Sequence, residues 1–412
     1  MSQIIYGPNN MTMEASTNLK DLSRTVIEAE LSSTVGIADK VIKLREQGET
    51  VYDFSAGRAF ENTPQYIIDE AISALMSGKT HQTMARGTTN YRKACAKKLL
   101  RENNITADPE KEIIATMGTK QGLTIALLAL LNPGDEVIIE NPCFVSYQQL
   151  INFAGGISVT VPLLPENDFR WNREDLEAKI TTKTKVILMN SPHNPTGTVH
   201  SIKDLEMIAS VAKAHDLYVI TDEVYERVCW DNKQHICLAS LPGMKERTIG
   251  VMGLTKGFSM GGWRIGFVYT SPVIAEQLEK LQQHLITSTN SFVQAGAATA
   301  FGESPRDEVL QYWKEWEEKC NYVCNALNDI DGISCKVPEG GFYAWADISS
   351  FGLSSEEFSK RLIEDAKVAV IPGASFGDVG EFYIRVTCVK SWEEVKSGMQ
   401  QIQKFVKKLN TK

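Results

Sequence analysis

Residues 251–268 read VMGLTKGFSMGGWRIGFV, two short apolar segments around a glycine-rich turn that holds one lysine, Lys256. The flanking segments TIGVMG and RIGFVYT have the length and apolar character of buried strands. A lysine ammonium is strongly hydrated, so burying it in such a turn is costly unless it is neutral, paired or covalently used. The position of Lys256 therefore calls for a chemical explanation.

The middle of the chain alternates short apolar segments with helical stretches. EIIATMG, EVIIE, ISVTVPL, KVILMN and LYVITD are further predicted strands, and SIKDLEMIASVAKAHD is one of the predicted helices between them. Strands that alternate with helices predict an α/β fold with a mostly parallel sheet covered by helices. After about residue 304 the pattern changes to a long amphipathic helix, two strands and two further helices. Each of these two helices is predicted to begin with a capping box, Ser354 with Glu357 and Ser391 with Glu394. We expect a smaller α+β domain there.

These changes in pattern predict where the domains begin and end. We expect an N-terminal arm over residues 1–21, an N-terminal part of the small domain over 22–60, a large domain over 61–304 and a C-terminal small domain over 305–412. The helical stretch LKDLSRTVIEAELSSTVGIADKVIKLREQG precedes the large domain and is expected to pack with the C-terminal part. The small domain is then discontinuous in sequence.

Composition narrows the class of protein. The 412 residues are 43% hydrophobic, which is enough for a sizeable core, and carry a formal charge of -8. An acidic chain does not favour nucleic-acid or lipid binding, and no apolar run reaches membrane-spanning length. The first twenty residues lack a basic start followed by an apolar core, so we expect no secretory signal and a cytoplasmic protein.

The eight cysteines are scattered and form no Cys-x-x-Cys pair. Cys320 and Cys324 are expected to share a helix face, but no nearby histidine completes a metal set. We therefore predict buried free thiols and no metal site.

Residues that follow the predicted strands are the candidates for chemistry, because open parallel sheets bind ligands at the carboxyl ends of their strands. Gly118, Thr119 and Lys120 begin a helix, where free N–H groups and the helix dipole suit a phosphate. Polar residues after later strands are Asn194, Asp222, Tyr225, Lys256 and Arg264. Each alone is typical of a turn, a cap or a surface residue, whereas the ordered set is much more specific.

The combined set has the chemistry needed to hold pyridoxal 5'-phosphate. A lysine forms a Schiff base with the aldehyde, and a carboxylate keeps the pyridine nitrogen protonated. Hydroxyl and amide donors stabilise the ring oxygen, while arginine and backbone amides bind the phosphate. This interpretation explains Lys256, because a lysine bound to the cofactor loses much of its burial cost.

Motifs along nearly the whole chain, from about Leu22 to Leu409, resemble one family. They are LREQG, GTTNYRKA, GTKQGL, NPGDEVIIENPCFVSY, NSPHNPTGTV, TDEVYE, TKGFSMGGWRIGF, GGFYAWAD and FYIRVT. The chain is similar to the class I and II aminotransferases of pyridoxal-phosphate fold type I, most of all to the branch with bacterial aspartate aminotransferases. The resemblance implies transfer of the α-amino group of an L-amino acid to a 2-oxo acid. It also implies a homodimer with shared active sites.

The resemblance further implies a role for each motif residue. Lys256 is expected to be the Schiff-base lysine and the base at the substrate Cα, and Asp222 to pair with the pyridinium nitrogen. Tyr225 and Asn194 are expected at the ring oxygen. The phosphate is expected to contact Gly118, Thr119, Lys120, Arg264 and Gln82. Phe144 is expected to stack on the ring, and Asn194, Arg385 and Gly57 to bind the substrate carboxylate.

Four positions depart from the pattern of the family. Gln82 stands where a tyrosine is usual, and Phe144 where tryptophan is common. Arg58 directly follows Gly57 and is either a solvated arginine or a binding group for an anion. Gly253 replaces a frequent serine. Gln82 is either a tolerated change or a sign of altered control over the bound intermediate.

Two alternative functions stand beside transamination, and the departures at Gln82 and Arg58 motivate the first. The first is a pyridoxal-phosphate enzyme of the same fold that eliminates, replaces, cyclises or oxidises. The second is a non-catalytic binding module, which the retained Lys256, Asp222 and Arg385 disfavour.

Overall fold

The computed structural model describes residues 22–29, 33–303 and 305–410. Its contacts divide the chain into residues 1–30 and residues 31–412. In the first unit only the short helix α1 (Arg24–Ile27) is described, and the predicted arm over 1–21 lies outside the described residues. The expected helical stretch over residues 19–48 is interrupted, because α1 ends at Ile27 and α2 begins at Ser33. Serine and threonine at 32–34 favour helix caps over helix interiors.

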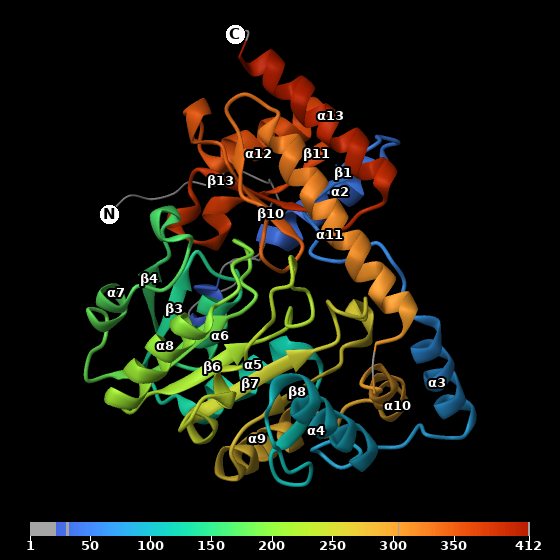
Figure 1. Ribbon diagram of the computed structural model, residues 1–412, viewed down its shortest axis with the longest axis vertical. Helices are drawn as coiled ribbons and strands as arrows, with labels where there is room; N and C mark the ends of the chain where they lie inside the picture. Colours follow the sequence, from blue (N-terminus) through green and yellow to red (C-terminus); the bar gives the residue numbers. More distant parts are fainter. Residues whose placement is uncertain (1–21, 30–32, 304, 411–412) are drawn as a thin grey trace. The chain divides into compact units, whose positions relative to one another are not determined.

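The second unit contains the remaining elements (Figure 1). Its strands are β1 Tyr52–Asp53, β2 Ile113–Thr116, β3 Glu136–Asn141, β4 Ile157–Pro162, β5 Thr184–Asn190, β6 Tyr218–Asp222, β7 Thr248–Gly253, β8 Gly266–Tyr269, β9 Ser334–Cys335, β10 Tyr343–Asp347, β11 Val368–Ala369, β12 Ile371–Pro372 and β13 Tyr383–Thr387. Its α-helices are α2 Ser33–Glu46, α3 Gln65–Met76, α4 Thr89–Asn103, α5 Gly118–Leu130, α6 Tyr147–Phe153, α7 Arg173–Glu177, α8 Ile202–Ala214, α9 Pro272–Leu285, α10 Ser291–Ala300, α11 Asp307–Asn328, α12 Ser355–Ala366 and α13 Trp392–Leu409.

The largest sheet has seven strands in the order β2-β8-β7-β6-β5-β3-β4. All neighbouring pairs are parallel except those made by β8, which is antiparallel to both β2 and β7. The expected α/β fold with a mostly parallel sheet is therefore confirmed. The reversed direction of β8 brings the chain back across the sheet directly after the Lys256 turn.

Both faces of this sheet are covered because side chains alternate along each strand. Val137 and Ile139 of β3 face a core shared with α5, α6 and α9. Ile138, between them, faces a second core with α8. A third core joins β2 and β8 to α4 and α10. With helices on both faces, the strand ends are the places where polar side chains can meet.

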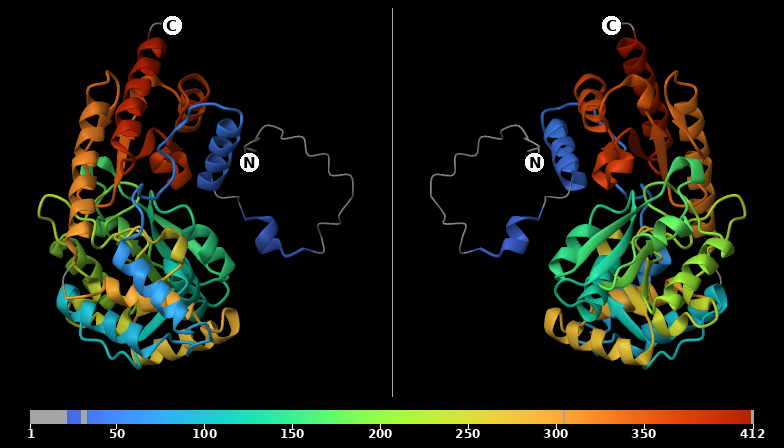
Figure 2. Two further views of the ribbon diagram at one scale, coloured as in Figure 1. Left: turned by 90° about the vertical axis from the view of Figure 1, so that its right-hand side faces the viewer. Right: turned by 90° about the vertical axis from the view of Figure 1, so that its left-hand side faces the viewer.

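The smaller sheets combine segments that are far apart in sequence. β12, β13, β10 and β9 form an antiparallel sheet, and β1 pairs in parallel with β11. Val41 of α2 packs with Ile363 of α12. Figure 2 shows α11 beside α13, where the rings of Tyr322 and Trp392 lie 5.7 Å apart. The domain boundaries given above remain predictions.

The predicted serine caps form, but the reciprocal half of each capping box does not. The hydroxyls of Ser354 and Ser391 accept hydrogen bonds from the backbone N–H groups of Glu357 and Glu394. The Glu357 carboxylate instead accepts from Arg361. The Glu394 carboxylate accepts from the backbone N–H of Asp53, the last residue of β1. Glu394 therefore joins α13 to the N-terminal segment.

All eight cysteines are free thiols, as expected, and seven are buried, whereas Cys229 is only partly buried. Among the described residues no helix is both long and apolar enough to cross a membrane.

Candidate active site

Lys256 lies in the turn after β7, partly buried, with its ammonium between aromatic rings. Its Nζ donates a hydrogen bond to the carbonyl oxygen of Gly57. The same nitrogen lies 5.5 Å from the ring centre of Tyr225 and 5.7 Å from that of Phe342. A Cβ on Gly57 would approach the Tyr343 hydroxyl to 2.6 Å, so only glycine leaves room for this contact. Gly57 and Lys256, which are 199 residues apart in sequence, are thus in direct contact.

Asp222 ends β6 and is buried at 4% exposure. The Tyr147 hydroxyl donates to its Oδ2 at 2.9 Å, and the Val224 N–H donates to its Oδ1 at 3.3 Å. Burial raises the pKa of Asp222 to about 6, although the Tyr147 hydrogen bond opposes that rise. Among the described residues the hydrogen-bond partners of the Asp222 carboxylate are the Tyr147 hydroxyl and the Val224 N–H, and no lysine or arginine is in direct contact, so this carboxylate suits a cationic ligand.

Tyr225 and Tyr343 form a pair of phenols beside Lys256. Their hydroxyls lie 2.8 Å apart, and both side chains are buried. Burial alone would raise the pKa of Tyr343, but Lys256 and then Arg385 outweigh burial and lower that pKa below its usual value. Tyr343 therefore interacts with two cations and with Tyr225 at once.

Arg385, on β13, is buried at 3% exposure and held in place on both sides. Its Nη1 donates to Asn194 Oδ1 at 3.0 Å, and its Nη2 donates to the Ser55 carbonyl at 3.0 Å. Its guanidinium lies 4.2 Å from the ring centre of Tyr343. The buried Nε has no hydrogen-bond partner among the described residues. A buried guanidinium with an unused donor suits an anionic ligand.

Gly118, Thr119 and Lys120 begin α5 as predicted. Gly118 has φ 76°, and a Cβ there would meet Arg264 Nη2 at 2.6 Å. Lys120 lies 5.5 Å from the ring centre of Phe144. Partial burial, and then Arg264, lower the pKa of Lys120. Two neighbouring cations at a helix N-terminus suit a phosphate.

At position 253, where serine is frequent in the family, the glycine lies close to Thr119. A Cβ on Gly253 would lie 2.7 Å from the Cγ2 of Thr119. Glycine on β7 thus leaves room for the Thr119 methyl group.

Two predicted positions are not brought into this cluster. The side chain of Gln82 is exposed, and within the described chain no hydrogen bond joins it to the other site residues. Arg58 is also exposed, in contrast to its neighbour Gly57, whose carbonyl contacts Lys256. The solvated interpretation of Arg58 fits this exposure.

Sequence reasoning missed Tyr147, Tyr343 and Ser55 as members of the site. Tyr147 and Tyr343 lie within the quoted motifs NPCFVSY and GGFYAWAD, but neither follows a predicted strand. Ser55 contributes only its backbone carbonyl, which no residue-type signal reveals.

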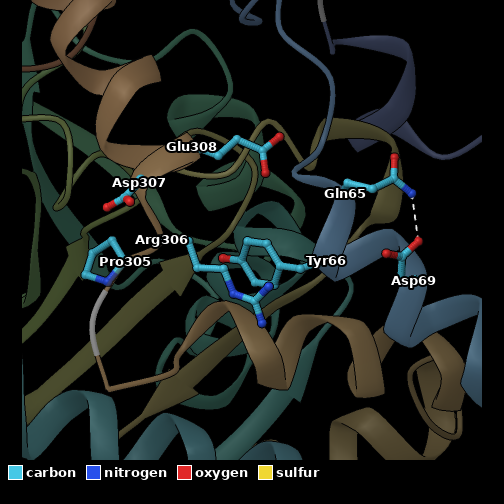
Figure 3. A pocket seen from close by; sticks show the side chains of 7 residues that line it. All are labelled: Gln65, Tyr66, Asp69, Pro305, Arg306, Asp307 and Glu308. Carbon is cyan, nitrogen blue, oxygen red and sulfur yellow. Dashed lines mark hydrogen bonds between the residues drawn. The ribbon is translucent and has the colours of Figure 1, made fainter.

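A surface pocket lies between the start of α3 and the start of α11 (Figure 3). It is lined by Gln65, Tyr66, Asp69, Pro305, Arg306, Asp307 and Glu308. The Arg306 guanidinium lies 4.0 Å from the ring centre of Tyr66. None of the predicted site residues lines this pocket, so it gives no support to a catalytic role there.

Comparison with known proteins identifies the class. The family model for aminotransferases of class I and II matches residues 48–402. The chain is 42% identical to an aspartate aminotransferase of Pyrococcus abyssi over 87% of this chain and 92% of that protein. It is 38% identical to aromatic-amino-acid aminotransferase 2 of Thermococcus litoralis over 89% of this chain and 95% of that protein. It superposes with a TM-score of 0.89 on Thermus thermophilus aspartate aminotransferase with maleate, at 32% identity, covering 93% of this chain and 99% of that one.

The chain belongs to the class I and II aminotransferases of fold type I. It is a pyridoxal-phosphate-dependent transferase that moves the amino group of an amino acid to a 2-oxo acid. The comparisons favour neither the elimination, cyclisation or oxidation alternative nor a non-catalytic module.

The donor set fits pyridoxal phosphate. Lys256 offers an amine, Asp222 a buried acid for the ring nitrogen and Tyr225 a hydroxyl. The N-terminus of α5 offers N–H groups beside Lys120 and Arg264. The Nε of Arg385 is a further buried donor without a partner among the described residues.

Proposed function

We propose that Lys256 carries the cofactor and moves the proton at the substrate Cα. Bound pyridoxal phosphate supplies an aldehyde for the amino group and a ring that draws electrons from the Cα. The observation that carries the assignment is that Tyr343 interacts with Lys256 and Arg385 and hydrogen-bonds Tyr225. One phenol thus links the proposed base, the proposed ring-oxygen donor and the proposed carboxylate site.

Asp222 is proposed to bind the protonated ring nitrogen, with Tyr147 fixing its orientation. An isolated buried carboxylate is destabilising, and burial raises the pKa of Asp222 accordingly. A pyridinium beside it would offset that cost and keep the carboxylate charged. Tyr225 and Asn194 are proposed at the ring oxygen, and Phe144 on the ring face. Gly118, Thr119, Lys120 and Arg264 are proposed at the phosphate.

Arg385 is proposed to bind the α-carboxylate of the substrate. Asn194 and the Ser55 carbonyl already hold two of its nitrogens, so the fork is oriented before substrate arrives. The carbonyl of Gly57 faces Lys256 beside it. Pre-positioning of this kind lowers the entropic cost of reaching the reactive geometry.

An acidic amino acid is the proposed donor and 2-oxoglutarate the proposed acceptor. Relatives named aspartate aminotransferase, and a neighbour solved with the dicarboxylate maleate, support this choice. Aromatic amino acids are the second candidate, supported by the Thermococcus litoralis relative.

A cytoplasmic homodimer is the proposed state. Phe60, Met76 and Met84 are large apolar side chains with exposures of 62%, 84% and 57%. All three lie within residues 60–84, around α3, and a contiguous apolar patch there would mark a surface covered by a partner. Gln82 lies beside Met84 in sequence and is exposed, so it is proposed to reach the phosphate of the partner's site. Analytical ultracentrifugation tests the dimer, and reconstitution of Gln82→Ala with pyridoxal phosphate tests the contact by a weaker dissociation constant.

A single-turnover experiment tests the reaction. The purified holoenzyme is mixed with acidic, aromatic, basic or aliphatic amino acids without 2-oxo acid, and absorbance and products are followed together. We expect L-aspartate or L-glutamate to convert the cofactor fully to its amine form with one equivalent of 2-oxo acid. Conversion by aromatic amino acids alone would transfer the assignment to them. Loss of a substituent or consumption of oxygen would contradict transamination.

A further inference from the structure

Glu223, His235 and Cys237 form a compact buried cluster next to the candidate active site. Glu223 directly follows Asp222 at the end of β6, and the other two lie in the segment between β6 and β7. The side chains of Glu223 and His235 are 2% and 4% exposed, and Cys237 is buried at 1%. None of the three has a role in the proposed aminotransfer reaction.

The three donor atoms have the spacing of metal ligands. Cys237 Sγ lies 3.3 Å from Glu223 Oε2 and 3.6 Å from His235 Nε2, and His235 Nε2 lies 3.6 Å from Glu223 Oε1. Zinc bonds of about 2.0–2.1 Å to nitrogen or oxygen and about 2.3 Å to sulfur place tetrahedral ligand pairs about 3.3–3.6 Å apart. Each observed contact is close to these separations, although Cys237 and His235 approach different oxygens of Glu223. One ligand atom from each residue lies within 4.8 Å of the others, so a small rotation of the carboxylate would let a single oxygen face a shared ion.

The charges of the cluster also favour a divalent cation. Glu223 is a buried acid whose only basic neighbour within ion-pair distance, in the described part of the chain, is His235. The nearby Lys98 is already paired with Glu226. A divalent cation with one carboxylate and one thiolate leaves the cluster neutral. The buried Nδ1 of His235 also has no hydrogen-bond partner among the described residues, so this imidazole is incompletely satisfied.

A supporting residue holds the carboxylate from the opposite side. The Tyr269 hydroxyl of β8 donates to Glu223 Oε2 at 2.9 Å. To reach Glu223, which directly follows β6, the ring of Tyr269 crosses β7 at Gly250, where a Cβ would lie 2.0 Å from the ring. The Tyr269 hydroxyl is the donor in this contact, because an ionised carboxylate can only accept. Hydrogen bonds from such supporting groups fix the orientation of metal ligands.

We propose that Glu223, His235 and Cys237 bind a zinc ion, with Tyr269 orienting the glutamate and one coordination position left for water. A thiolate, an imidazole and a carboxylate together favour zinc over calcium or magnesium. Residues 231–234, beside His235, are all exposed and give the ion a short path from solvent. The ion would fix the segment after Tyr225 to the sheet.

Binding must release the thiol proton, which gives the proposal a specific signature. An uncoordinated thiol is protonated at neutral pH, whereas the form that binds zinc is the thiolate. Zinc binds the thiolate and displaces this proton to the buffer. The heat of binding should therefore change with the ionisation enthalpy of the buffer.

The test is titration of the holoenzyme with zinc chloride by calorimetry in two buffers, with metal content measured after desalting. We expect one zinc per chain and about one proton released. Cys237→Ser and His235→Gln should each weaken zinc affinity at least tenfold. Cys229→Ser is the matched control, because Cys229 lies in the same segment and is the one cysteine that is not buried.

Circular dichroism and cofactor absorbance establish that each variant is folded, and His235→Gln carries the test if Cys237→Ser does not fold. Absence of saturable binding to the wild type would overturn the proposal. So would full affinity in folded Cys237→Ser and His235→Gln variants, or loss of binding in Cys229→Ser alone.

Discussion

The Tyr147 hydroxyl donates a hydrogen bond to Asp222 Oδ2 at 2.9 Å, and both side chains are buried. Tyr147 begins α6 and Asp222 ends β6, so the contact joins two elements 75 residues apart in sequence. It stabilises the ionised form of an acid whose burial favours the neutral form.

Replacing Tyr147 with phenylalanine should therefore raise the pKa of Asp222 and lower kcat. Hydrogen bonds to charged groups contribute about 1.5–3 kcal/mol, which corresponds to at least a tenfold loss of rate. The acidic limb of the kcat/KM profile should move to higher pH. Tyr322→Phe, whose ring packs on Trp392 away from the site, is the control. An unchanged pH profile in Tyr147→Phe would argue against this role.

The pKa of Asp222 also predicts a pH dependence of stability in the apoenzyme. The folded-state pKa is about 6 and the ordinary value is 3.8, so the folded protein binds this proton more tightly. Its contribution is fully present below the ordinary pKa and is lost as pH rises through about 6. Between pH 5 and pH 8 the loss is about 1–1.5 kcal/mol.

Asp222→Asn should remove this part of the pH dependence. Urea unfolding of both apoenzymes at pH 5 and pH 8 measures this pH dependence. The stability of the variant relative to wild type should be higher at pH 8 than at pH 5. If the difference in unfolding free energy between Asp222→Asn and wild type is the same at pH 5 and pH 8, Asp222 ionises normally in the folded chain.

Arg385→Lys should raise the KM for the amino acid about 30–100-fold. Lysine keeps the charge but loses the fork that Asn194 and the Ser55 carbonyl orient. Steady-state kinetics with the best donor from the single-turnover panel measures the effect. Arg58→Lys, at an exposed position, should leave KM within twofold. A larger effect of Arg58→Lys would assign the carboxylate site to Arg58.

The buried ion pair between Lys98 and Glu226, the residue after Tyr225, should contribute strongly to the free energy of unfolding. Lys98 Nζ lies 2.5 Å from Glu226 Oε2, and the Lys98 side chain is fully buried. Burial alone would raise the pKa of Glu226, but Lys98 and then Arg227 outweigh it and lower that pKa to about 2. Lys98→Met leaves the buried Glu226 carboxylate with Arg227 as its remaining ion-pair partner, and should cost up to about 3–5 kcal/mol of unfolding free energy.

Urea unfolding of the holoenzyme measures this cost. Lys97→Met, on the exposed side of α4, should change stability by less than about 0.5 kcal/mol. The double variant Lys98→Met/Glu226→Gln should recover most of the loss. No recovery would mean that Lys98 acts through packing and not through its charge.

Local sequence patterns predicted the strands and the residues at their ends. Asp222 and Lys256 follow apolar segments directly, so a rule about strand ends finds them. The direction of β8 was not predictable, because alternating apolar segments do not encode whether a strand runs parallel or antiparallel.

Long-range contacts explain most of what the sequence left open. Arg385 meets Asn194 across 191 residues, and only the family resemblance assigned it a role. The zinc proposal depends on Glu223 meeting His235 and Cys237 after the chain has turned back on itself. It also depends on Gly250 leaving room for Tyr269, which is a steric fact of the folded sheet.

Locating the attached cofactor tests the central claim most directly. The holoenzyme is reduced with borohydride, digested and mapped by mass spectrometry, with Lys256→Ala as the control. We predict that the pyridoxyl phosphate mass is on Lys256 alone, and that Lys256→Ala shows neither this mass nor turnover. The pyridoxyl mass on another lysine such as Lys120, or normal turnover by Lys256→Ala, would contradict the account.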